Sequence, residues 1–158
     1  MLSTIFASAG ASEATAPFPI LSALILLPLL GAVIVTLLSN RRPEYVKLVA
    51  IIISVGTAAM SLWMLAKFET QDADFQFVSQ HEWIRAWGIS WHLGVDGISL
   101  FLVVLTGILF PLVIVGVDPH HDEKRYLGWL LLLEAGVMGS FLSLDLFLFF
   151  IFFEIVLV

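Results

Sequence analysis

The sequence predicts an all-α membrane protein, a polytopic bundle of transmembrane helices with a short β-ribbon at its outer surface. Its 158 residues are 60% hydrophobic and only 13% charged, and the mean hydropathy is +1.04. A soluble domain is nearer to about half apolar and about a quarter charged. The net charge of −6 leaves no basic stripe for nucleic acid, and the absence of Cys excludes disulfides and thiolate metal sites. These values exclude an ordinary soluble globule, a disordered tail and a nucleic-acid-binding protein.

Four apolar runs are long enough to cross a bilayer, which takes about 20 residues in a helix. They cover residues 19–38, 46–66, 97–117 and 126–144. A fifth apolar run, residues 146–158, is too short to cross at about 1.5 Å per residue. We therefore interpret residues 1–158 as the N-terminal part of one membrane domain, with an incomplete fifth helix.

The charged residues between the spans predict the orientation of the chain. The first loop contains Arg41, Arg42 and Lys47, and the third contains Lys124 and Arg125. The longer second loop has an acidic excess, and the N-terminal tail has no positive charge. Because positive residues favour cytoplasmic loops, we expect the N-terminus outside and the first and third loops inside.

The second loop contains the predicted ribbon, within residues 75–95. Apolar and polar side chains alternate over residues 89–95, a period of two that is typical of a strand. Three tryptophans spaced four apart would also fit an interfacial helix. We favour the strand because Gly88 and Gly94 would weaken a helix.

Three residues at or within the spans have predicted structural roles. Asp96 directly precedes the third span, where its carboxylate can accept hydrogen bonds from the first free helical N–H groups. We interpret it as a helix cap, with proton handling as the alternative. Pro28 and Pro111 lie inside the first and third spans, where each removes a backbone N–H and predicts a kink.

Glu134 and Glu154 are the candidate sites for proton translocation. A charge at the centre of a membrane helix costs ~2.5–3.5 kcal/mol, so such residues are functional candidates by default. Counted from the turn at Asp145, the two acids lie roughly 16 Å and 14 Å deep, near the middle of the membrane. All seven Lys and Arg lie at span ends or in loops, so no cation of this chain can neutralise either acid. The alternative role is a neutral glutamic acid that holds helices together.

The fourth predicted span has a face of small residues, made of Gly136, Gly139, Ser140 and Ser143. Such a face allows another helix to approach closely. Glu134 points away from it, and a carboxylate is unfavourable against lipid. We therefore expect both faces of this helix to contact protein.

Two motifs resemble a known family. Residues 88–100, GISWHLGVDGISL, are similar to a segment of the M subunit of respiratory NADH–quinone oxidoreductase, whose mitochondrial counterpart is chain 4. Residues 143–150, SLDLFLFF, followed by Phe153 and Glu154, resemble the start of that family's fifth helix. The second motif is shared more loosely with the related L and N subunits and with cation/proton antiporters. Phe101 is a departure, because Pro is common there in the family.

The resemblance implies an antiporter-like fold with an inverted repeat of helical units. It also implies that Glu154 pairs with a lysine on a later, broken helix outside this chain. No cofactor or metal is expected here, because NADH, FMN, iron–sulfur clusters and quinone would belong to other subunits. The sequence His-His-Asp-Glu at residues 120–123 is interpreted as a solvated turn rather than a metal site.

The predicted function is that of a membrane subunit of NADH–quinone oxidoreductase that takes part in proton translocation coupled to electron transfer. No redox site is expected in this chain. The expected partners are other membrane subunits and the lipid bilayer, in a bacterial or archaeal plasma membrane rather than the mitochondrial inner membrane. The alternatives are the D-type subunit of a multisubunit cation/proton antiporter and a structural membrane scaffold without transport.

Overall fold

The computed structural model describes residues 20–38, 43–69, 74–84, 89–117 and 123–157. This part of the chain forms five helices and two strands. In chain order they are α1 (Ile20–Leu37), α2 (Pro43–Lys67), β1 (Gln76–Ile84), β2 (Ile89–Val95), α3 (Gly97–Gly116), α4 (Glu123–Leu142) and α5 (Leu146–Leu157). A helix lies over each of the five predicted apolar runs, so the predicted all-α class is confirmed.

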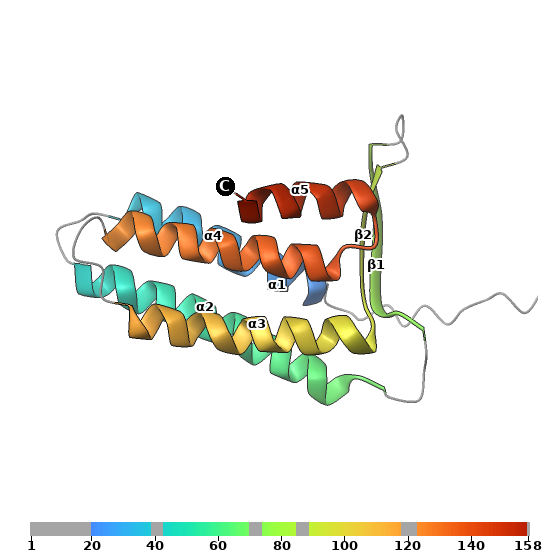
Figure 1. Cartoon of the computed structure of the whole chain (residues 1–158), viewed down its shortest axis with the longest axis horizontal. Helices are drawn as coiled ribbons and strands as arrows, with labels where there is room; N and C mark the ends of the chain where they lie inside the picture. Colours follow the sequence, from blue (N-terminus) through green and yellow to red (C-terminus); the bar gives the residue numbers. More distant parts are fainter. Residues whose placement is uncertain (1–19, 39–42, 70–73, 85–88, 118–122, 158) are drawn as a thin grey trace, which may run out of the picture.

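The helices run side by side, and the two strands cross one end of the bundle (Figure 1). Helices α1, α3 and α5 begin at this ribbon end, whereas α2 and α4 end there. Among the described helices, α1, α2 and α3 are long and apolar enough to cross a membrane. Helix α4 has 20 residues, but it contains Glu134 and a charged first turn, and α5 has only 12 residues.

The buried apolar side chains form two clusters, one at each end of the bundle. The cluster at the ribbon end joins the strands to the helices, and its members include Leu21, Leu24, Leu93, Leu100, Met138 and Leu142. The cluster at the other end is smaller, and its members include Val35, Val46, Ala50, Ile114, Leu127 and Leu131. Since burial of apolar surface is the main stabilising term, these two clusters fix how the helices pack.

A polar layer lies between the two apolar clusters, and it contains every buried polar side chain of the described residues. Its members are Ser54, Thr57 and Ser61 on α2, Thr106 on α3 and Glu134 on α4. Four of them, including Glu134, have no exposed surface, and Thr106 is 8% exposed. Buried polar groups are costly unless they are hydrogen-bonded, so this layer is the exceptional region of the bundle.

The strands β1 and β2 form an antiparallel ribbon, which confirms the predicted ribbon and the strand over Ile89–Val95. His92 pairs with Gln80, and the register shifts between Gln76 and Ser79, where Phe77 has a φ of 55°. On its other side, β2 contacts the turn that follows α4, because Leu144 donates its N–H to the His92 carbonyl at 2.9 Å. The ribbon is therefore attached to the turn from which α5 begins.

Helix α4 is the central helix of the bundle. It contacts α1, α2, α3 and α5, as expected from its two dissimilar faces. Its small-residue face packs on α5, where a Cβ added to Gly136 would lie 3.0 Å from Val156 and one added to Gly139 would overlap the Phe152 ring. Glycine at these two positions allows α5 to approach closely.

Candidate functional site

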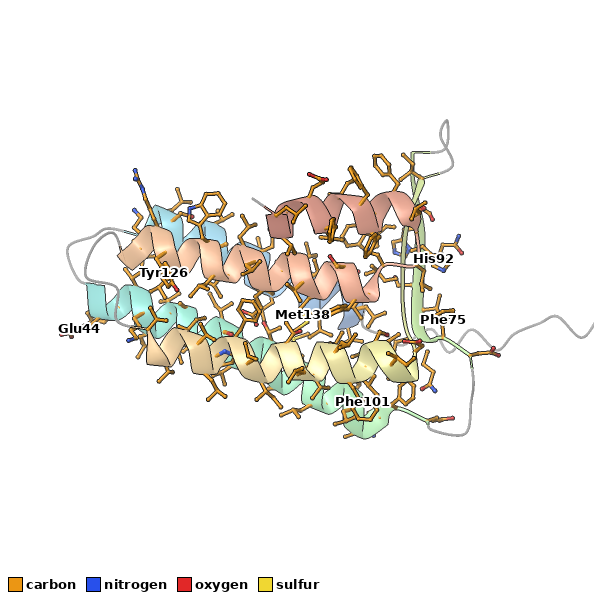
Figure 2. The ribbon with its side chains drawn as sticks, in the orientation of Figure 1. Glu44, Phe75, His92, Phe101, Tyr126 and Met138 are labelled. Carbon is orange, nitrogen blue, oxygen red and sulfur yellow. The ribbon has the colours of Figure 1, made fainter. Side chains whose placement is uncertain are left out.

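The candidate site is the carboxyl group of Glu134, on the face of α4 opposite to α5. Met138 follows one turn later on the same face and is also fully buried, in the interior of the bundle (Figure 2). The Ser54 hydroxyl on α2 donates a hydrogen bond to Glu134 Oε1 at 3.1 Å. The second oxygen, Oε2, is buried and has no hydrogen-bond partner among the described residues.

Sequence reasoning missed Ser54, because it searched for cationic partners only. A signal was available: Ser54, Thr57 and Ser61 follow one another at i, i+3 and i+7 in an otherwise apolar run, so they mark one face of a helix. The structure places this face of α2 inside the bundle, with all three hydroxyls buried. The polar stripe of α2 thus marks the face of this helix that packs against the Glu134 carboxyl group.

The other two hydroxyls of this stripe bond within α2. Thr57 donates to the Ile53 carbonyl at 3.2 Å, and Ser61 donates to the Ala58 carbonyl at 2.8 Å. Such bonds satisfy a buried hydroxyl without any partner on another helix. Ser54 therefore differs from the other two in making an interhelical bond.

Helix α3 covers the polar layer at Gly107. A Cβ added there would lie 2.5 Å from the Ser61 Oγ and 3.3 Å from the Ala58 Cα, so α2 and α3 touch almost backbone to backbone. Thr106 beside it donates to the Leu102 carbonyl at 2.7 Å. The layer is thus enclosed by α2, α3 and α4 in the middle of the bundle.

Glu154 lies in a different environment from Glu134. Its side chain is exposed on α5. The rings of Phe149 and Phe153 stack elsewhere on the same helix, with centroids 5.8 Å apart. Phe152 from the same helix packs on α4 at Gly139, and Glu134 faces α2. The structure therefore brings Glu134 together with Ser54 and leaves the two acids on different sides of α4.

Asp96 is the N-cap residue of α3. Its Oδ1 accepts the Ser99 backbone N–H at 2.8 Å, and the Ser99 hydroxyl oxygen accepts the Asp96 N–H at 3.0 Å, which completes a capping box. The hydrogen bonds from Ser99 hold the pKa of the Asp96 carboxyl below its usual range. Asp96 is therefore ionised at neutral pH and fully engaged with the helix end.

Asp145 has a second capping role that sequence reasoning did not assign. Its Oδ1 accepts the backbone N–H groups of Phe147 at 2.8 Å and Leu148 at 3.2 Å, and its Oδ2 accepts the N–H of Ser90 at 3.2 Å. Burial raises the pKa of this carboxyl, but the hydrogen bonds from Ser90, Leu148 and Phe147 outweigh it and lower the pKa overall. Asp145 thus joins the start of α5 to strand β2.

The remaining predicted residues lie in less specific surroundings. Pro28 and Pro111 are buried inside α1 and α3, and both helices continue through them. In the part of the chain that the structure describes, no group of three His, Asp or Glu could hold a metal ion. Most of the His-His-Asp-Glu turn, residues 120–122, lies outside that part.

These features define a class of protein: a polytopic helical membrane protein in which, among the described residues, Glu134 is the one buried carboxyl group. The fold matches that of one chain in a solved membrane complex. A chain in the structure of the membrane-bound sulfane sulfur reductase, an archaeal respiratory membrane complex, matches 88% of this chain with a TM-score of 0.71. The match is 21% identical and covers 28% of that chain, so it shows the fold alone.

Sequence comparison identifies the particular relatives. NADH-ubiquinone oxidoreductase chain 4 of Marchantia polymorpha is 39% identical over 140 residues, which are 87% of this chain and 28% of the relative. NADH-quinone oxidoreductase subunit M is 37% identical over 147 residues in Rickettsia conorii, covering 89% and 30%. The subunit M of Mycobacterium tuberculosis is 33% identical over 171 residues, covering 89% and 31%.

By sequence, the chain is a homologue of subunit M and chain 4 of the NADH-quinone oxidoreductases, which confirms the resemblance seen in its motifs. It spans less than a third of the length of these curated relatives. No protein-family model matches the chain.

Proposed function

We propose that this chain forms part of a membrane subunit of an NADH–quinone oxidoreductase and takes part in proton translocation coupled to electron transfer. The observation that supports this function best is the carboxyl group of Glu134, which is fully buried and has one oxygen without a hydrogen-bond partner among the described residues. Placing an ionisable group inside an apolar bundle is costly, so its retention favours a role in moving charge.

The names of the relatives favour this function over an antiporter subunit without a redox partner, since these homologues are subunits of NADH-quinone or NADH-ubiquinone oxidoreductases. The scaffold alternative assigns Glu134 and Ser54 only to holding α2 against α4. Proton translocation and the scaffold alternative differ in whether Glu134 must exchange a proton.

The proposed subunit is an integral protein of the plasma membrane with its N-terminus outside. Lys47, Lys124 and Arg125 lie near the end of the bundle that is opposite the ribbon (Figure 1), and positive residues favour the cytoplasmic side. The ribbon is then at the outer surface. A Cys introduced at Asn40 should react with impermeant reagents only from the cytoplasmic side, and one at Asp72 only from outside. The reverse pattern would contradict this orientation.

The proposed partners are the other membrane subunits of the complex. NADH, FMN, iron–sulfur clusters and quinone are assigned to other subunits, so this chain contributes proton handling and no redox chemistry. Glu154, exposed on α5, is available to a lysine from outside the chain, and such a pair would lower the cost of its charge in the membrane.

The decisive experiment is Glu134→Gln in the intact complex. Glutamine keeps the shape of the side chain and most of its hydrogen bonding but cannot release a proton. We expect normal assembly and a large loss of proton pumping, measured with quinone-linked NADH oxidation in membranes. The matched control is Glu44→Gln, which changes an exposed acid at the start of α2. A Glu134→Gln complex that pumps like the parent would support the scaffold alternative.

A further inference from the structure

The inner face of α2 contains three fully buried hydroxyls with two different bonding patterns. Thr57 and Ser61 donate to carbonyls of their own helix. Ser54 instead donates across the helix interface to Glu134 Oε1, at 3.1 Å. The three hydroxyls are equally buried on one face of α2, but among them only that of Ser54 contacts the carboxyl group of Glu134.

This contact makes the carboxyl group of Glu134 asymmetric. Oε1 is held by Ser54, whereas Oε2 is buried and has no partner in the described part of the chain. Leaving a buried polar atom unpaired costs about 1–3 kcal/mol, more for a charged group. The apolar clusters on both sides of the layer separate this oxygen from bulk water. An internal water is the simplest group that can pair with it.

The α2 stripe can complete the coordination of such a water. A buried water typically makes two to four hydrogen bonds. Thr57 uses its hydroxyl proton on the Ile53 carbonyl, so its oxygen keeps lone pairs that can accept a further bond. Thr57 lies on the same face of α2 as Ser54, three residues further along.

We propose that Ser54 is a positioning residue for proton exchange at Glu134. Its hydroxyl fixes Oε1, and Oε2 is the oxygen that binds an internal water and exchanges a proton with it. In this step the O–H bond at Oε2 breaks as the water oxygen takes the proton, and the reverse step restores the acid. The inference rests on the proposed role of Glu134 in proton translocation and adds the residue that orients it.

A test uses three variants of the intact complex. Ser54→Ala removes the hydroxyl that contacts Glu134, and Ser54→Thr retains a hydroxyl. Ser61→Ala is the matched control, because it is the same change on the same buried face of the same helix, at a hydroxyl that bonds only within α2. The readouts are the proton-pumping rate and the infrared band of the Glu134 carboxyl group, assigned by its loss in Glu134→Gln.

We expect Ser54→Ala to assemble, to shift the Glu134 band to higher frequency, and to lower the pumping rate about tenfold, equivalent to ~1.4 kcal/mol. A C=O bond that loses a hydrogen bond vibrates at higher frequency. Ser54→Thr should restore most of the rate, and Ser61→Ala should resemble the parent in both readouts. If Ser54→Ala fails to assemble, Ser54→Cys keeps the side-chain volume with a weak donor and should show the same band shift with a partial loss.

Three outcomes would overturn the inference but not the proposed function. One is an unchanged Glu134 band in Ser54→Ala, or in Ser54→Cys if that variant has to be used. Another is a loss of pumping in Ser61→Ala as large as that in Ser54→Ala. It would mean that removing any buried hydroxyl of α2 lowers the pumping rate equally. The third is normal pumping by Ser54→Ala while Glu134→Gln is inactive, which would overturn the positioning role alone. Normal pumping by Glu134→Gln would instead overturn the proposed function of this acid and the inference with it.

Discussion

Ser90 in strand β2 and Asp145 at the start of α5 are joined by hydrogen bonds, with the Ser90 backbone N–H 3.2 Å and its hydroxyl 3.4 Å from Asp145 Oδ2. The other oxygen of Asp145 caps the first turn of α5. One carboxylate therefore connects the ribbon to the helix that contains Glu154. This connection fixes the start of α5, whereas Glu154 lies near the other end of that helix.

Asp145→Ala should reduce the amount of assembled complex. The change removes both the cap of α5 and the bond to Ser90, and loss of an N-cap costs ~0.5–2 kcal/mol. Asp145→Asn keeps one acceptor oxygen for the cap of α5 but places an NH2 group against the Ser90 backbone N–H, so its assembly should be intermediate. Asp74→Ala, at an exposed acid, is the control for loss of a negative charge, and assembly can be followed by native gels of solubilised membranes. Equal assembly of the Asp145→Ala and Asp74→Ala complexes would contradict the capping role.

Asp96 should behave as a structural cap and not as a proton carrier. Its pKa lies below the ordinary value, so its stabilising effect is complete above that value and is lost only as the pH falls through the acid range. Asp96→Asn retains an acceptor for the Ser99 N–H and should assemble and pump nearly normally. Asp96→Ala should lower the yield of assembled complex, by the ~0.5–2 kcal/mol expected for a lost cap. A fully assembled Asp96→Asn complex that cannot pump would show that the acid exchanges protons.

Glu154→Gln should abolish most proton pumping if Glu154 pairs with a cation outside this chain. Glutamine keeps the size of the side chain but removes the titratable proton, and Glu154→Asp, which withdraws the acid by one methylene, should be intermediate. Because Glu154 is exposed on α5, neither change disturbs the described core. Assembly is measured separately from pumping. A Glu154→Gln complex with parental pumping would leave the residue without a role in translocation.

Gly139→Ala should disturb the packing of α5 on α4. An added Cβ would overlap the Phe152 ring close to its attachment point, where the side chain cannot move aside easily. Overpacking of this kind costs typically ~1–3 kcal/mol. Gly116→Ala is the matched control, because an added Cβ there meets no atom within 4 Å. Thermal stability of the purified complex should fall for Gly139→Ala and stay the same for Gly116→Ala.

Local patterns in the sequence determined much of this protein. Helix ranges follow from the length of the apolar runs, the strand at Ile89–Val95 from its alternation, and the small-residue face of α4 from helical spacing. Each of these features depends on neighbours within a few residues along the chain. The same is true of Asp96, whose partner Ser99 is three residues away.

The tertiary structure decided which elements meet. The Ser54–Glu134 bond joins residues 80 positions apart, and Asp145 meets Ser90 across 55. The spacing of Ser54, Thr57 and Ser61 marks one face of α2. It does not say which helix that face meets, so the sequence alone does not name Ser54 as the partner of Glu134. The rotation of α2 relative to α4 is fixed by the two apolar clusters, which pack side chains from separate helices around the polar layer. The environment of Glu134 is therefore a consequence of packing between helices. The helix that contains Glu134 and the approximate depth of this residue in the membrane could be predicted from the sequence alone.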